Sequence, residues 1–333
     1  MKTESVMVQN LCVPCACRCR YCLLSWDGKP VGVSWERGAA FAERFLAEAK
    51  AAAPELRCAF AFGYSMEHPH LREALRFLRR IGSPQADFLQ CDGMKQRNEQ
   101  ECAALTEMLA AEGVRHLNVT LYGLPAYHDR FAGRPGDFDL LTRLLAAAAA
   151  AGLRASVGVP LTKENVSQAD ELVALLRNKG SEGITLFIPH EEGRGAALAQ
   201  VRLEKGDLDA LSSGARGLLN PRLYRTEGAW VAEKNAPEET KRALMLSLTP
   251  GVIDRYEQRS APALIREIEA LDDQYYAAYP AFGELAERYG DPSGEKLYRK
   301  RDLFAHYRKL FAREYGVAVY DVTDERQSGS RRY

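Results

Sequence analysis

The feature that most constrains this chain is a regular alternation of short strand patterns and longer helix patterns over its first two thirds. Runs rich in β-branched and aromatic residues predict strands, and amphipathic runs between them predict helices. The predicted strands cover residues 5–11, 57–62, 86–90, 116–121, 154–159 and 183–188. The predicted helices cover residues 35–53, 71–80, 98–112, 138–151 and 166–178.

Strands and helices that alternate about every 30 residues predict right-handed βαβ units and a parallel sheet. Six such units are too few for a complete eight-stranded barrel, so we expect either an open partial (β/α)6 barrel or a doubly wound sheet. Both are α/β folds, and in both the ligands bind at the C-terminal ends of the strands. Functional side chains are therefore expected just after each strand.

Beyond about residue 200 the pattern changes to longer, charged helices at 263–279 and 295–315, followed by a strand-like run at 317–322. We therefore expect two regions, a partial barrel over residues 1–200 and an α-rich C-terminal extension over residues 201–333. The extension is a candidate substrate-binding or lid region. The polar tail from residue 321 fits either a frayed terminus or a flap over the active site.

Charge and hydropathy exclude several classes of protein. The 45 basic side chains balance the 45 acidic ones, so no net field draws the chain to nucleic acid or anionic lipid. No run of about 18 uncharged apolar residues is present, so a membrane span is not expected. Residues 1–11 lack the apolar core of a secretory signal. We therefore expect a cytoplasmic protein.

Five of the eight cysteines crowd into one short segment, at Cys12, Cys15, Cys17, Cys19 and Cys22. The chain is too long to need disulfides for stability, and the cytosol is reducing. This clustering therefore predicts a metal or iron–sulfur site. The isolated Cys58, Cys91 and Cys102 are interpreted as structural residues.

Cys15, Cys19 and Cys22 follow the first predicted strand with the spacing C-x3-C-x2-C. Three thiolates on a short loop can bind three irons of a [4Fe-4S] cluster and leave the fourth iron open to an amine and a carboxylate. Two other arrangements stay open, because Cys12 completes two C-x2-C pairs. Zinc uses such pairs, although usually with about a dozen residues between them. A ferredoxin uses four cysteines and leaves no open iron.

The cysteine loop, with Tyr21 before Cys22, resembles that of the radical S-adenosylmethionine (SAM) enzymes, whose C-x3-C-x-aromatic-C motif follows the first strand of a partial (β/α)6 barrel. The resemblance implies that a [4Fe-4S] cluster on Cys15, Cys19 and Cys22 chelates SAM. An electron from the cluster then cleaves SAM to a 5′-deoxyadenosyl radical, which abstracts hydrogen from the substrate. The implied partners are a low-potential electron donor, such as flavodoxin or ferredoxin, and a peptide or small-molecule substrate.

The same resemblance implies SAM contacts after the second and third strands. Gly63, Ser65 and Glu67 stand where the family has Gly-Gly-Glu, whose backbone carbonyls receive the SAM ammonium, although this chain lacks the second glycine. Asp92 stands where the family often has Thr-Asn-Gly, and a short polar side chain there suits a ribose contact or a turn.

Further contacts are implied after the later strands. Thr120 stands where a hydroxyl meets the SAM carboxylate. Asn165 is either a contact to the SAM ribose or carboxylate, or the N-cap of the next helix. The backbone at Ile188 is expected to support the adenine, with Tyr21 on its other side. For His128 we expect only a structural hydrogen bond.

Two functions therefore follow from the sequence. The first is a radical SAM enzyme, and the second is a non-catalytic iron–sulfur protein for electron transfer or redox sensing. The polar residues after several strands favour the enzyme. The pattern at the fourth strand favours a peptide substrate, whereas the lack of cysteines for auxiliary clusters after residue 200 favours a small molecule.

Overall fold

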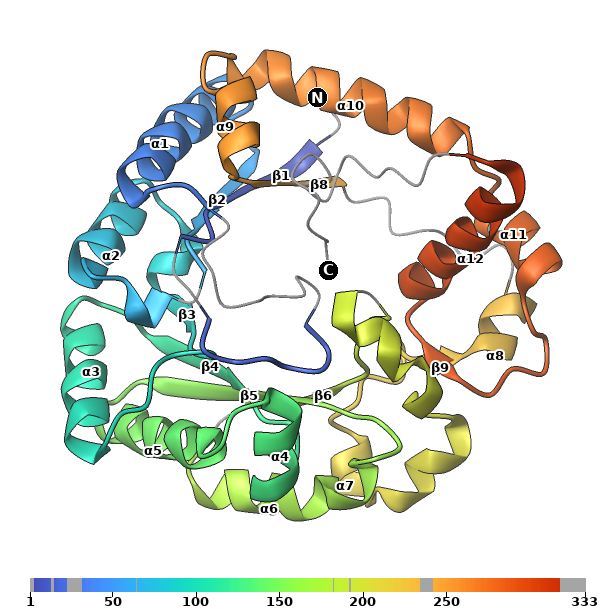
Figure 1. Ribbon diagram of the computed structural model, residues 1–333, viewed down its shortest axis with the longest axis horizontal. Coiled ribbons are helices and arrows are strands. Elements are labelled where there is room, and N and C mark those ends of the chain that lie inside the picture. The colour runs from blue at the N-terminus through green and yellow to red at the C-terminus, as the bar shows by residue number, and fades with distance from the viewer. Residues whose placement is uncertain are drawn as a thin grey trace.

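The computed structural model describes residues 3–12, 15–22, 32–63, 65–181, 183–191, 193–233 and 242–317. The proposed tail flap, at 321–333, and most of the strand-like run at 317–322 lie outside these ranges. Within them, strands form an inner arc and helices an outer one, as a partial barrel requires (Figure 1).

All six predicted strands are present, and every pairing among them is parallel. They are β1 (Thr3–Gln9), β2 (Arg57–Ala61), β3 (Phe88–Gln90), β4 (His116–Thr120), β5 (Arg154–Pro160) and β6 (Gly183–Phe187). The helices on the outside of this part are α1 (Trp35–Ala52), α2 (Leu71–Arg80), α3 (Glu99–Ala111), α4 (Pro125–Ala132), α5 (Asp137–Ala150) and α6 (Ala169–Asn178). The α/β partial barrel is therefore confirmed. Helix α4 was not predicted, because it is only two turns long.

The six barrel strands divide between two sheets, β3-β4-β5-β6 and β2-β1-β8, the second of which also contains β8 (Arg242–Ser247). Between β2 and β3 the chain passes through α2 and the short 3₁₀ helix η2 (Pro84–Ala86). The buried hydroxyl of Ser83 donates to the Phe60 carbonyl at 2.9 Å and accepts from the Phe60 N–H at 3.1 Å. The Ser83 side chain thus satisfies both backbone polar groups of Phe60, where β2 forms the edge of its sheet. Buried backbone groups need such partners.

The strand β8 (Arg242–Ser247) pairs in parallel with β1, with Val6 opposite Leu244 and Val8 opposite Leu246. No strand was predicted there, because alanine, leucine and methionine favour helices and the segment is short. The pairing with β1 overrides that preference. A strand from the C-terminal region therefore extends the N-terminal sheet.

The remaining elements after β6 complete the ring seen in Figure 1. They are η4 (Gly193–Val201), η5 (Lys205–Ala210), α7 (Ser213–Arg216), β7 (Arg225–Thr226), α8 (Glu227–Ala232), α9 (Pro250–Tyr256), α10 (Ala261–Ala277), α11 (Phe282–Tyr289), β9 (Leu297–Tyr298) and α12 (Lys300–Tyr315). The helix predicted from residue 295 begins at Lys300, because β9 pairs antiparallel with β7.

Two hydrophobic cores hold these elements. The larger core joins the barrel strands and helices to β8, α9 and α10 through Leu244, Leu246, Ile253 and Leu264. The smaller core lies around α8, α11 and α12 and contains Trp230, Phe282, Leu285, Leu303 and Tyr307. Residues after 200 therefore contribute to both cores. None of the helices in the described ranges has the length and apolarity of a bilayer-spanning segment.

The place of β8 in the larger core can be tested with Leu246→Ala. Leu246 is fully buried, so the truncation is expected to lower the free energy of unfolding by about 2–5 kcal/mol. The matched change Leu271→Ala, at a side chain on α10 that is 40% exposed, should cost less than about 0.5 kcal/mol. Urea unfolding followed by circular dichroism measures both. Equal midpoints for the two variants would contradict the placement of β8.

Candidate functional site

Residues 15–22, which we term the cysteine loop, are held by backbone hydrogen bonds to the last turn of α4 and to the loop after β3. The N–H groups of Arg18 and Arg20 donate to the carbonyls of Ala132 and Phe131, at 2.7 and 3.0 Å. Those carbonyls belong to the last turn of α4, where a helix leaves its acceptors unused. The Ala16 N–H donates to Gly93, after β3, at 2.8 Å.

The segment after β6 contacts the cysteine loop from another direction. The backbone N–H of Arg194 donates to the Cys22 carbonyl, and its Nε donates to the Cys19 carbonyl, both at 3.0 Å. A Cβ on Gly195 would overlap the His190 carbonyl oxygen, so only glycine lets the chain pass this close to His190. The Gly-Arg-Gly sequence therefore has a structural role in positioning the cysteine loop.

The thiols of Cys15, Cys17, Cys19 and Cys22 gather in one cluster with Leu11. Cys15 and Cys17 are buried, Cys19 and Cys22 are half-buried, and all are free of disulfides. The adjacent Cys17 thiol and burial raise the pKa of both Cys15 and Cys19. Metal binding at these positions would therefore release protons.

The residues present fit a [4Fe-4S] cluster, because thiols are its ordinary ligands and Gly93 leaves room beside them. Gly93 has φ +72°, and a Cβ there would overlap the Cys15 Sγ. Among the described residues, no three His, Cys, Asp or Glu side chains converge as ligands of one metal ion. Cluster ligands need not do so, since each thiolate binds a different iron.

Cys17 points into a buried hydrogen-bond network beneath the loop. Its Sγ donates to Asp137 Oδ2 at 3.7 Å, and the His128 Nε2 bonds the same oxygen at 3.1 Å. Arg134 pairs with the other oxygen of Asp137 at 3.1 Å. Burial raises the pKa of Asp137, against the effect of its hydrogen bond to His128. His128 therefore has the structural role expected of it.

Three predicted cofactor-binding residues meet beside the cysteine loop. Asp92 accepts from the Thr120 N–H and from the Thr120 hydroxyl, both at 2.8 Å. Burial raises the pKa of Tyr21, against the effect of the nearby Thr120 and Tyr122 side chains. Burial raises the pKa of Asp92 to about 7, although its hydrogen bonds with Thr120 act in the opposite direction. Carbonyl, carboxyl and hydroxyl groups thus line the mouth of the barrel next to the thiols.

The ring of Tyr21 lies in an aromatic cluster rather than on an open surface. Its centroid is 5.5 Å from that of Tyr122, 6.1 Å from Phe131 and 6.3 Å from Phe187. Phe187 ends β6, so the ring of Tyr21 joins the ends of β4 and β6. This is the side of the mouth where an adenine contact was expected.

The residues after β2 have two different surroundings. Gly63 has φ +50°, and a Cβ there would overlap Leu11, so only glycine suits this turn. The Glu67 carboxylate is 16% exposed and is already paired, since it accepts from Arg97 Nη1 at 2.5 Å and from the Lys95 N–H at 2.9 Å. Ser65 begins the 3₁₀ helix η1 (Ser65–Glu67). Its side chain is not part of what the structure describes.

Asn165 is buried, and its amide is saturated within the protein. Its Nδ2 donates to the Tyr122 carbonyl at 2.6 Å and to the Pro160 carbonyl at 2.8 Å. Its Oδ1 accepts from the N–H of Thr162 at 2.7 Å and from its hydroxyl at 3.3 Å. It makes no capping bond to the 3₁₀ helix η3 (Val166–Gln168) that follows. The side chain therefore joins the loops after β4 and β5.

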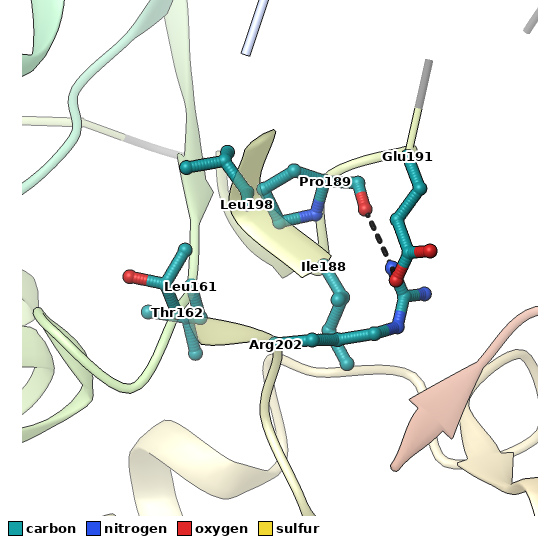
Figure 2. Close-up of a pocket in the computed structure, with 7 residues that line it drawn as sticks. All are labelled: Leu161, Thr162, Ile188, Pro189, Glu191, Leu198 and Arg202. Carbon is teal, nitrogen blue, oxygen red and sulfur yellow. Dashed lines mark hydrogen bonds and ion pairs between the residues drawn. The ribbon is translucent and has the colours of Figure 1, made fainter. Parts of the chain in front are cut away.

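The side chain of Ile188, just after β6, is 1% exposed and faces a small internal cavity (Figure 2). The cavity has a volume of about 10 Å³, room for a single water. Arg202 lies along it and donates to the Pro189 carbonyl and to Glu191, both at 3.1 Å. Any contact of Ile188 with a ligand at the mouth would therefore come from its backbone.

Sequence reasoning missed Tyr122 as a functional candidate. It lies just beyond β4, after Leu121, and is 2% exposed, and its hydroxyl donates to the Cys19 Sγ at 3.0 Å. Burial raises the pKa of Tyr122, so the phenol stays protonated. The only sequence signal for a functional role of Tyr122 is its position directly after the fourth predicted strand, which ends at Leu121.

No family model matches the chain, and no curated protein sequence matches it. Among solved structures, SuiB of Streptococcus suis is 13% identical, with a TM-score of 0.47, over 77% of this chain and 52% of SuiB. Coproporphyrinogen III oxidase (HemN) from Escherichia coli, titled a radical SAM enzyme, is 12% identical, with a TM-score of 0.44, over 75% of this chain and 64% of HemN. The methyltransferase TsrM of Kitasatospora setae is 18% identical, with a TM-score of 0.36, over 60% of this chain and 39% of TsrM. The chain thus spans about half the length of SuiB.

The glycine beside the thiols can be tested with Gly93→Ala. The new Cβ would displace Cys15, so iron per chain after anaerobic reconstitution is expected to fall while the circular dichroism spectrum stays native. Gly82→Ala is the matched control, because Gly82 has φ +69° and a Cβ there meets no described atom within 4 Å. Both variants should lose about 1 kcal/mol of stability from the strained backbone. Wild-type iron content in Gly93→Ala would refute the role of Gly93.

The supporting role of Asn165 predicts that Asn165→Leu destabilises the protein without any ligand. The change leaves buried backbone groups without partners, so the free energy of unfolding should fall by at least about 2 kcal/mol. Asn178→Leu, at an exposed position on α6, should stay within about 0.5 kcal/mol. Denaturant unfolding without SAM measures both. An unchanged midpoint together with weaker SAM binding would instead identify Asn165 as a SAM contact.

Proposed function

We propose that this chain is a radical SAM enzyme in which Cys15, Cys19 and Cys22 bind a [4Fe-4S] cluster. The main support is the gathering of these thiols at the C-terminal ends of β1, β3, β4 and β6, in a loop that neighbouring backbone holds in place. When bound, such a cluster supplies an electron that cleaves SAM to a 5′-deoxyadenosyl radical, which takes hydrogen from a substrate. The protein supplies orientation and exclusion of water.

The surroundings of Cys12 favour three ligands over four. Cys12 packs against the larger hydrophobic core, not within the thiol cluster around Leu11. The Cys17 thiol does lie in that cluster, but it donates to Asp137 and is therefore proposed as a non-ligand. This arrangement is unfavourable for a four-cysteine electron carrier, which is the alternative function.

The residues at the mouth have separate roles in this proposal. Thr120 and Asp92 present a hydroxyl and a carboxyl group for the polar atoms of SAM, and Tyr21 closes the side next to β6. The backbones at Gly63, Ser65 and Ile188 supply carbonyl and N–H groups. Glu67 and Asn165 act indirectly, because their side chains already bind other parts of the protein.

The remaining assignments belong to the same proposal. The barrel of residues 1–200 holds the cofactors, and residues 201–333 contribute to substrate binding. The substrate is a peptide or a small molecule, and a flavodoxin or ferredoxin delivers the electron. A cytoplasmic location suits a site of free cysteine thiols, which needs a reducing compartment.

The ligand assignment predicts a clear division among five alanine variants. Anaerobically reconstituted wild-type protein should hold about four irons per chain. Cys15→Ala, Cys19→Ala and Cys22→Ala should each abolish the cluster, measured by iron content and by the visible absorption of the cluster. Cys12→Ala and Cys17→Ala are the matched controls and should retain it. Loss of the cluster in Cys12→Ala would favour the electron carrier.

Enzyme function predicts slow cleavage of SAM even without the natural substrate. Under dithionite or reduced flavodoxin, the iron-loaded protein should release 5′-deoxyadenosine and methionine, measured by liquid chromatography. The Cys17→Ala protein should do the same, whereas Cys19→Ala should not. An iron-loaded wild-type protein that binds no SAM would rule out the proposed function.

A further inference from the structure

A phenol from outside the cysteine loop donates a hydrogen bond to the sulfur of one proposed cluster ligand. The Tyr122 hydroxyl lies 3.0 Å from Cys19 Sγ and donates a hydrogen bond to it. Tyr122 is buried, so this bond is shielded from bulk water. A hydrogen bond in such surroundings is electrostatically stronger than one in water.

Two backbone hydrogen bonds and two ring contacts fix the position of this hydroxyl. The Tyr122 N–H donates to His128 Nδ1 at 3.1 Å, and the Tyr122 carbonyl accepts from Asn165 Nδ2 at 2.6 Å. The ring stacks against His128 and Phe131, with centroids 5.0 and 4.6 Å apart. Backbone and ring are thus both held, so the hydroxyl has little freedom to leave the sulfur.

The other partner of His128 extends this support to the cysteine loop itself. His128 Nε2 bonds Asp137, which also accepts from the Cys17 thiol. Tyr122 and the cysteine loop are therefore tied to the same buried network. The distance between the phenol and Cys19 is set by the fold, not by a chance side-chain rotamer.

A donor at this sulfur has a definite effect on redox chemistry. Reduction adds negative charge to an iron–sulfur cluster and its thiolates, so a hydrogen bond to a ligand sulfur stabilises the reduced form more than the oxidised form. Hydrogen bonds to the sulfurs are among the factors that set the potential of such clusters. The bond therefore makes reduction easier.

We propose that Tyr122 is a positioning residue that raises the reduction potential of the cluster by donating a hydrogen bond to Cys19. The inference rests on the proposed function, since it requires that Cys19 is a cluster ligand. It gives Asn165 and His128 a common purpose, because both orient Tyr122.

The test uses Tyr122→Phe in the full-length, anaerobically reconstituted protein. The change removes the hydroxyl and keeps the ring, so the midpoint potential should shift to a more negative value at unchanged iron content. Potentiometric titration followed by electron paramagnetic resonance measures it. Tyr127→Phe is the matched control, because the Tyr127 hydroxyl donates to Glu164 at 3.0 Å and its ring lies in the same aromatic cluster. Its potential should equal that of wild type.

A second variant gives a shift of the opposite sign. Site-specific incorporation of 3-fluorotyrosine at position 122 keeps the ring and the hydroxyl but makes the phenol a stronger donor, so the potential should become less negative. If Tyr122→Phe loses its cluster, this variant decides the question. An unchanged potential in the fluorinated protein, or in Tyr122→Phe with its cluster intact, overturns the inference alone. A wild-type protein without any cluster overturns the proposed function as well.

Discussion

The hydrogen bonds between the cysteine loop and the last turn of α4 are the constraint on which the rest of the site depends. The loop is irregular backbone, so it has no internal ladder to hold its thiols in place. Its N–H groups at Arg18 and Arg20 instead use the carbonyls that α4 leaves unused, and Gly93 and Arg194 complete the support. The position of the thiols is therefore an outcome of how β3, β4 and β6 end, not of the loop sequence alone.

Polar side chains at the barrel mouth divide into two groups by what they already bind. Asn165, Glu67 and His128 are saturated or paired inside the protein. Asp92 and Thr120 bind mainly one another, Asp92 also accepts from Gln90, and their oxygens retain acceptor capacity. Both groups stand where a cofactor contact was expected. Residues that support the loops and residues that could bind a ligand thus lie at the same strand ends. The two roles can be told apart only by the hydrogen-bond partners of each side chain.

The strands and the cysteine loop could be predicted because their signals are local. Strand runs bounded by helix patterns define β1 to β6, and the spacing of Cys15, Cys19 and Cys22 is visible in eight residues. The bonds of Asn165 to Tyr122 and of Glu67 to Arg97 could not be predicted, because these partners lie 43 and 30 residues away along the chain. Strand β8 was missed because its residues favour helices, and its pairing partner β1 is also far away in the sequence.

The pairing of β1 with β8 also has a consequence for the nascent chain. The cysteine loop is made well before Arg242–Ser247, so β1 keeps one edge open until that later segment has emerged. Contacts of such long sequence separation form late in folding. Until that segment emerges, the thiols belong to an unfinished barrel. In the proposed enzyme, insertion of the cluster into a finished site would therefore have to follow the pairing of β8 with β1.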